Sequence, residues 1–226
     1  MRSLKIPEKL RIEFATVEAI WGSSAETRRV DCLVLSWVKY EKQLRRLFSF
    51  FVYQHPEINE GEIDKIISVF ADNRNLYPET FISSIEAIGV LPVQEIMGKR
   101  YDELWPEIER IKGYRNKIMH GQHTGQAIQS AQLEKDVILL VHWVSTLADA
   151  SESAYGYDGL ERKTYRAAKG AKKVNMQSYP FTNPEEFNAW LTETTSRKKA
   201  NNAVQIDNLQ ASQIGVPLRS TLRQFG

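Results

Sequence analysis

Two residues near the middle of the chain carry the side chains that chemistry on a phosphate ester requires. Arg115 has a cation that stays charged at physiological pH, and His120, five residues later, has a side chain that titrates near neutrality. An arginine can grip a phosphate through two parallel hydrogen bonds and oppose the negative charge that develops on it, and a histidine can move protons. The pair therefore has the residue types of a metal-independent site that cleaves phosphate esters.

The pair lies near the end of a predicted helix that begins around Leu104 and ends at Gly121, a natural residue for the position after a helix. At about 100° per residue the apolar positions form one stripe, which also contains Arg115. The apolar positions of this stripe are Leu104, Ile108, Ile111 and Ile118. A cation there needs an anionic partner or a solvent-filled cleft, because burying an unpaired charge costs much free energy. Arg115 and His120 point about 140° apart on an ideal helix, so they converge only if the helix unwinds or the arginine reaches across.

The stretch Arg115–His120, with the letters RNKIMH, resembles the Arg-x4–6-His signature of HEPN domains, including the polar residue that often follows the arginine, here Asn116. HEPN domains are small helical bundles, and many are ribonucleases. The segment Tyr40–Phe48 is similar to their early helix, where a charged residue can face the catalytic cleft. The resemblance says little about residues 161–226.

This resemblance implies a metal-independent endoribonuclease that cleaves tRNA or mRNA by attack of the 2′-hydroxyl. Arg115 would bind the phosphate, His120 would transfer protons and Asn116 would assist. HEPN ribonucleases are typically homodimers in which two motifs meet and supply two histidines, so a homodimer is implied as well. They commonly serve as toxins with an antitoxin, or in antiphage defence. Some carry a tyrosine two residues after the histidine as a site for modification, but Gln122 stands there in this chain.

Three neighbours are candidates for supporting roles, each with an ordinary alternative. Glu41 can pair with Arg115 across the bundle, or locally with Arg45 four residues on. Lys117 can contact an RNA backbone, or it can be a solvated surface lysine. Tyr114 can stack on a base, or it can pack inside the protein.

A non-catalytic alternative stays open, because HEPN domains without activity exist. His120 can interact with the carbonyl end of its own helix, worth roughly 0.3–1 kcal/mol when protonated. Arg115 can form a salt bridge with no role in catalysis. The chain would then be a helical binding module that uses the same face to hold a protein or a nucleotide.

Other classes of function find little support in the sequence. The four histidines show no metal-ligand spacing, and no Gly-rich phosphate loop or G-x-S-x-G elbow occurs, so no metal or cofactor is expected. The net charge of +2 predicts no basic field over the whole surface that would attract a nucleic acid. A local basic patch is compatible with this net charge. The single Cys32 excludes an internal disulfide and fits a reducing compartment. No signal-peptide pattern and no apolar run near ~20 residues occur, so we expect a cytoplasmic protein with no membrane partner.

The hydrophobic pattern predicts an all-α protein, an HEPN-like antiparallel helical bundle over residues 1–160. Predicted helices cover about residues 7–21, 24–53, 63–72, 78–88, 104–121 and 130–156, with residues 92–98 a helical turn or a loop. The second helix follows a capping box at Ser23–Glu26, and Ser130 is the predicted cap of the last.

Residues 161–226 form a basic C-terminal extension in this prediction. Residues 161–200 hold nine Lys or Arg against four Glu, a net charge of +5. One helix is predicted from Asn183 and Pro184, and the rest is predicted to be partly extended or disordered. The basic stretch can track RNA, or it can be a solvated arm that packs on a partner subunit.

Overall fold

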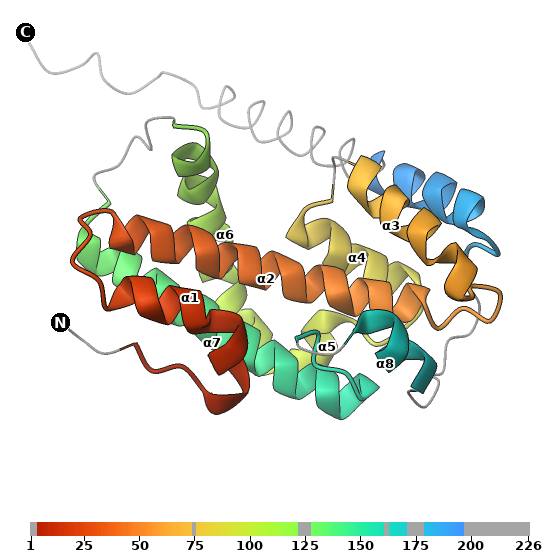
Figure 1. The fold of residues 1–226 in the computed structure, drawn as a ribbon, viewed down its shortest axis with the longest axis horizontal. Helices are drawn as coiled ribbons and strands as arrows, with labels where there is room; N and C mark the ends of the chain where they lie inside the picture. The colour runs from red at the N-terminus through yellow and green to blue at the C-terminus, as the bar shows by residue number, and fades with distance from the viewer. Residues whose placement is uncertain (1–3, 74–75, 122–127, 161–162, 171–178, 197–226) are drawn as a thin grey trace, which may run out of the picture.

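The computed structural model describes residues 4–73, 76–121, 128–160, 163–170 and 179–196, and this part contains helices and loops but no strand (Figure 1). The helices are η1 (Glu8–Leu10), α1 (Arg11–Trp21), α2 (Arg28–Val52), η2 (Glu60–Glu62), α3 (Ile63–Asp72), α4 (Pro78–Ala87), α5 (Val93–Met97), α6 (Lys99–Met119), α7 (Ser130–Tyr155), α8 (Thr164–Gly170) and a last helix over residues 184–196. The predicted all-α bundle is confirmed. None of the helices in these ranges combines the length and the apolar character that a membrane span requires.

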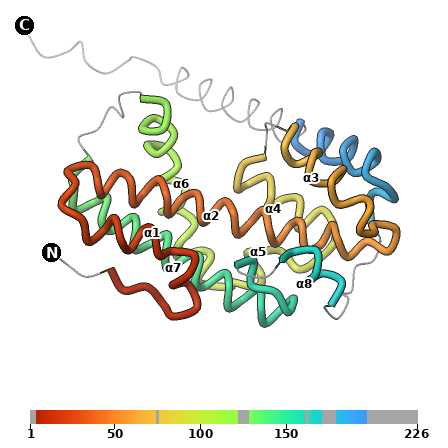
Figure 2. Tube along the Cα trace, viewed as in Figure 1, coloured from red at the N-terminus to blue at the C-terminus, as the bar shows by residue number. Residues whose placement is uncertain are grey.

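Helix α2 runs through the middle of the molecule and contacts α1, α4, α6, α7 and α8 (Figures 1 and 2). Its apolar stripe is fully buried, as the predicted periodicity requires. The stripe includes Leu33, Trp37, Tyr40, Leu44, Leu47, Phe48 and Phe51. Helices α2 and α7 run in the same direction, because Arg29 pairs with Glu134 near their starts and Phe51 contacts Tyr155 near their ends. This pair is therefore parallel rather than antiparallel as predicted. Helix α1 runs opposite to α2, because Glu13 near its start pairs with Lys42 whereas Val17, further along it, accepts from Cys32 near the start of α2.

Helix α6 packs on α7 in the reverse direction. Tyr101 and Trp105, near its start, contact Trp143, whereas Tyr114, near its end, reaches Asp136 one to two turns earlier on α7. Figures 1 and 2 show the C-terminal end of α6 standing out beyond α2. The predicted motif is therefore carried on a helix end that projects from the bundle.

Two predicted helix caps are wrong. The Ser23–Glu26 segment forms a turn in which Ser23 Oγ accepts a hydrogen bond from the Ala25 amide at 3.4 Å, and α2 begins only at Arg28. The residue before it, Thr27, donates to the Asp31 carboxylate instead of capping the helix. Ser130 is the first residue of α7 rather than its cap.

The start of α6 also differs from the prediction. The helix begins at Lys99 after Gly98, whose φ is +53°, so Pro106 lies inside the helix rather than near its start. Proline has no N–H, so the helix loses one backbone hydrogen bond there. Stacking of Tyr101 on Trp105, at 5.2 Å between ring centroids, and their packing on Trp143 stabilise the additional turns.

The C-terminal extension packs on the bundle wherever the structure describes it. Helix α8, which was not predicted, contacts α2, and the buried residues beyond it join the same core. These residues are Ala168, Phe181, Phe187 and Leu191. The predicted cap is confirmed, because Asn183 Oδ1 accepts the Glu186 amide at 2.9 Å. Six of the nine basic residues of the stretch lie outside the described residues, so its role stays a prediction.

Candidate functional site

The motif occupies the last turn of α6. The helix is regular to Met119, and His120 is its C-terminal cap residue with φ −96° and ψ 10°. Gly121 follows with φ +62°, a left-handed conformation that favours glycine, and its amide donates to the Ile118 carbonyl at 3.1 Å. Gly121 is thus the predicted residue after the helix, and the helix does not unwind before His120.

Arg115 reaches from α6 to α2, where it meets a carboxylate and an indole ring. Its Nη2 lies 3.4 Å from Glu41 Oε1, and its Cζ lies 5.2 Å from the centroid of the Trp37 ring. The Trp37 Nε1–H donates to the same Glu41 oxygen at 2.7 Å. Arg115 Nη1 donates to Asn116 Oδ1 at 2.8 Å. The guanidinium is therefore positioned by three side chains from two helices.

The guanidinium keeps hydrogen-bonding capacity to spare. A guanidinium has five N–H donors, and the Glu41 contact is long for a charge-assisted hydrogen bond. Arg115 Nε is buried and has no hydrogen-bond partner within the described part of the chain. The side chain keeps 16% of its surface exposed. A half-buried cation with unused donors can accept a second anion such as a phosphate oxygen.

Of the two partners considered for Glu41, the structure has Arg115. The local pair with Arg45 is not formed; Arg45 is exposed, and its Cζ lies 5.8 Å from the ring centroid of Phe81 on α4. Trp37 was not among the predicted site residues, so its place in the site was missed. Its signal was its spacing: an indole N–H needs an acceptor when buried, and Glu41 follows one helical turn later.

Tyr114 faces away from Arg115, into the bundle. It is buried, and its hydroxyl donates to the Asp136 carboxylate, which is fully buried on α7. Arg110 and Gln132 donate to Asp136 Oδ1 at 2.5 and 2.9 Å. Burial and the hydrogen bond to Asp136 raise the pKa of the Tyr114 hydroxyl well above its usual value, so the hydroxyl remains a donor. This is the packing alternative for Tyr114, not the base-stacking one.

Asp136 was also missed from the sequence. The available signal was a carboxylate flanked by buried apolar residues, Leu133 and Val137, on one side of the helix predicted over residues 130–156. A buried carboxylate requires partners. The sequence thus indicates that Asp136 needs hydrogen-bond donors, but it does not show which residues supply them.

The three remaining candidates, His120, Asn116 and Lys117, are exposed. The backbone amide of His120 donates to the Asn116 carbonyl at 3.1 Å, and no hydrogen bond or ion pair joins the His120 side chain to another side chain in the described ranges. The structure therefore brings Arg115, Asn116 and Glu41 together and leaves His120 apart, at the end of the same helix.

No group of three or more His, Cys, Asp or Glu side chains among the described residues is arranged to hold a metal ion. Comparisons of the chain with protein-family models, with curated proteins and with solved structures found no match. The function is therefore inferred from the motif and from the geometry around it.

Proposed function

We propose that this chain is a metal-independent endoribonuclease of the HEPN type that acts as a homodimer. One observation supports this most: the guanidinium of Arg115 is fixed beside Glu41 and Trp37 with donors to spare, five residues before an exposed histidine. A preorganised cation of this kind suits charge that develops on a phosphate in the transition state. In this proposal the chain is a cytoplasmic toxin or antiphage effector that targets RNA and has a regulatory protein such as an antitoxin.

In the proposed reaction, a histidine takes the proton of the RNA 2′-hydroxyl as the 2′-oxygen attacks the adjacent phosphorus. The bond to the 5′-oxygen breaks, and that oxygen receives a proton from a general acid. The products are a 2′,3′-cyclic phosphate and a 5′-hydroxyl. Arg115 opposes the negative charge on the pentacoordinate phosphorus. One chain supplies one His120, so two copies would supply the base and the acid.

The surroundings of the motif are compatible with a symmetric contact between two copies. Met119, four residues after Arg115 on the same face of α6, is 48% exposed. Val38, beside Trp37 on α2, is 42% exposed. A two-fold contact on the projecting end of α6 would cover these apolar side chains and bring two copies of His120 toward each other.

Cleavage of a mixed tRNA and mRNA pool in EDTA tests the proposal. We expect the wild-type chain to leave 2′,3′-cyclic phosphate ends, and Arg115→Ala and His120→Ala to cleave at least ~100-fold more slowly. Arg100→Ala and His142→Ala, which remove an exposed arginine and an exposed histidine elsewhere, serve as matched controls and should cleave like the wild type. A folded, dimeric wild-type chain that leaves RNA intact would refute the proposal.

A non-catalytic binding module is the second candidate, favoured by one observation. Arg115 is already engaged by Glu41 and Trp37, and no contact joins it to His120 in the described part of the chain. A binding module would keep its affinity for its partner after His120→Ala. Expression separates the two candidates as well: a toxic ribonuclease should express poorly as wild type and well as His120→Ala.

A further inference from the structure

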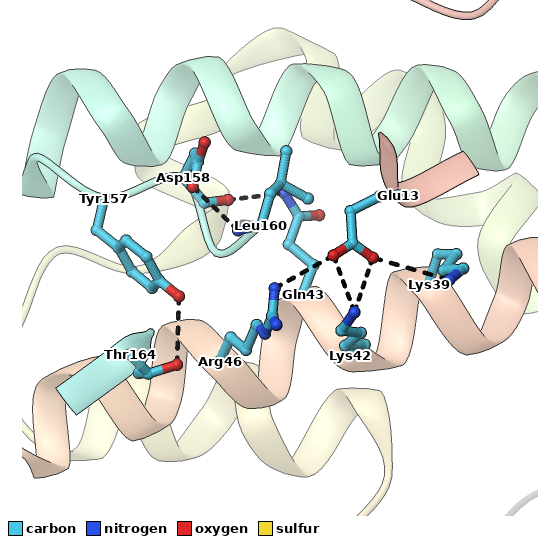
Figure 3. A network of polar contacts seen from close by, with 9 residues as sticks. All are labelled: Glu13, Lys39, Lys42, Gln43, Arg46, Tyr157, Asp158, Leu160 and Thr164. Atoms are coloured by element: carbon cyan, nitrogen blue, oxygen red, sulfur yellow. Dashed lines mark hydrogen bonds and ion pairs between the residues drawn. The ribbon is translucent and has the colours of Figure 1, made fainter. Parts of the chain in front are cut away.

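A second polar cluster lies on the other side of α2, where α1 packs against it. The carboxylate of Glu13, on α1, is surrounded by three cations of α2 (Figure 3). Lys42 Nζ lies 2.8 Å from both carboxylate oxygens, Arg46 Nη1 lies at 3.3 Å and Lys39 Nζ at 3.8 Å. The Glu13 side chain is only 10% exposed, so it is committed to this contact.

This cluster carries more positive charge than its carboxylate can balance. Burial raises the pKa of Glu13, but the hydrogen bond from Lys42 and the charges of Lys42, Arg46 and Lys39 outweigh that effect, and the net pKa lies below its usual value. Glu13 is therefore ionised near neutral pH and contributes one negative charge against three positive ones. Within the described ranges, these three cations form ion pairs with no other carboxylate. Lys42 and Arg46 remain 39% and 26% exposed.

The exposed side of α2 connects this cluster to the candidate active site. Glu41, the partner of Arg115, and Lys42 are consecutive, so they lie about 100° apart around the helix. The exposed Arg45 lies between them on that surface, because its position is about 40° from Glu41 and about 60° from Lys42. Figure 1 shows α2 crossing the molecule between α1 and the projecting end of α6.

We use the term α2 ridge for Lys39, Lys42, Arg45 and Arg46. Together with Arg115 the ridge supplies five cations, and the carboxylates in contact with these cations are Glu13 and Glu41, which gives a local charge of +3. The whole chain has a net charge of +2. Positive charge is thus concentrated here, beside the proposed active site.

We infer that the α2 ridge binds the phosphate backbone of single-stranded RNA that enters or leaves the Arg115 site. The inference deepens the proposed function, on which it rests, by naming the surface that holds the substrate. Spacings of three residues, from Lys39 to Lys42 and from Lys42 to Arg45, and of four, from Lys42 to Arg46, place these cations about 4.5–6 Å apart along the helix axis, which suits a strand with one negative charge per nucleotide. Contacts to phosphates alone give binding that is independent of base sequence.

The test measures binding of a short labelled oligouridylate by fluorescence anisotropy at several salt concentrations, with every protein carrying His120→Ala so that RNA stays intact. Each phosphate contact to a single strand contributes roughly 0.7 to the slope of log K against log salt concentration. We expect Arg45→Gln to reduce the slope by roughly 0.7 and Lys42→Gln with Arg46→Gln to reduce it by roughly 1.4. Arg45 is exposed and forms no ion pair with Glu13, so its variant tests the ridge without altering the Glu13 cluster.

Glu13→Gln supplies a test of opposite sign. It removes the carboxylate that competes for the cations, so RNA should bind more tightly, whereas damage to the α1–α2 contact would weaken binding. Lys65→Gln with Lys99→Gln removes two positive charges away from the ridge and should leave the slope unchanged. Equal slopes for the ridge variants and this control would overturn the inference. So would tighter binding of polyglutamate than of the RNA at equal salt, which would assign the ridge to an acidic protein.

These outcomes separate the two proposals. If the wild-type chain fails to cleave RNA while the ridge variants lose RNA affinity, the ribonuclease proposal fails and the RNA-binding ridge stands. If the wild-type chain cleaves RNA and the ridge variants bind it like the His120→Ala parent, the ridge inference fails and the ribonuclease proposal stands.

Discussion

Tyr114 and Arg115 are neighbours on α6, yet their side chains meet carboxylates in opposite ways. Tyr114 donates to Asp136, which is fully buried on α7 and accepts two further donors. Arg115 meets Glu41 through one contact of 3.4 Å, and both side chains keep part of their surface exposed. On the α7 side of α6, a buried carboxylate accepts three hydrogen bonds. On the α2 side, the Arg115 guanidinium keeps N–H donors that form no hydrogen bond with any described residue.

This difference separates a structural polar contact from one that is available to a ligand. A buried carboxylate that accepts three hydrogen bonds fixes the rotation of α6 against α7 and is closed to a ligand from solvent. That fixed rotation directs the next residue, Arg115, toward α2. Arg115 can turn toward an incoming anion at little cost in free energy, because its ion pair with Glu41 is long and weak.

Asp136→Ala should give the largest loss of stability. It leaves the Tyr114 hydroxyl and Gln132 without their acceptor and Arg110 with Glu107 alone, and removing one partner of a buried ionic contact costs about 3–5 kcal/mol. Urea unfolding followed by circular dichroism measures it. Asp149→Ala on the same helix, whose carboxylate is 75% exposed, is the control and should change the free energy of unfolding by no more than about 0.5 kcal/mol. Equal losses for the two variants would contradict a structural role for Asp136.

Tyr114→Phe should give the second largest loss. The ring stays buried, and only the hydroxyl that donates to the Asp136 carboxylate is removed. We therefore expect the free energy of unfolding to fall by about 1.5–3 kcal/mol in the same experiment. Tyr77→Phe, at a tyrosine that is 57% exposed, is the matched control and should be close to neutral. A neutral Tyr114→Phe would mean that Arg110 and Gln132 alone satisfy Asp136.

Arg115→Lys should leave stability within about 1 kcal/mol of the wild type, because its ion pair is loose and partly exposed. The same variant should cleave RNA roughly 100-fold more slowly, because a lysine keeps the charge but lacks the planar, bidentate fork. Arg100→Lys, at an exposed arginine, controls for the exchange itself. A destabilisation as large as that of Asp136→Ala would show that both sides of α6 are structural.

The smallest expected effect is the pH dependence of the Glu13 cluster. The pKa of Glu13 is lowered in the folded chain, so as the pH falls below 4.5 the unfolded state takes up its proton first. The stability that Glu13 contributes is therefore present above that pH and is lost as the pH falls through the folded pKa. We expect the wild-type chain to lose up to about 1 kcal/mol more than Glu13→Gln between pH 5 and pH 3. Parallel losses in the two chains would show that Glu13 is not stabilised by its three cations.

The features that the sequence predicted well depend on neighbours along the chain. The buried stripe of α2 follows from helical periodicity, Gly121 after α6 follows from its tolerance of positive φ, and Asn183 caps the last helix with its own side chain. The capping box at Ser23–Glu26 is local as well, but its prediction was wrong, because a serine hydroxyl satisfies a turn as readily as a helix end.

The sequence by itself determined the helices, their apolar faces and an arginine that had to find a partner. Only the tertiary structure decided which partner that was. Glu41 had an arginine four residues away and another 74 residues away, and local spacing cannot rank the two, whereas packing of α6 beside α2 brings the distant one into contact. Asp136 became the anchor of α6 for the same reason. A charge that loses water on folding needs compensation from whichever groups the packed helices bring to it, and those groups come from anywhere in the chain.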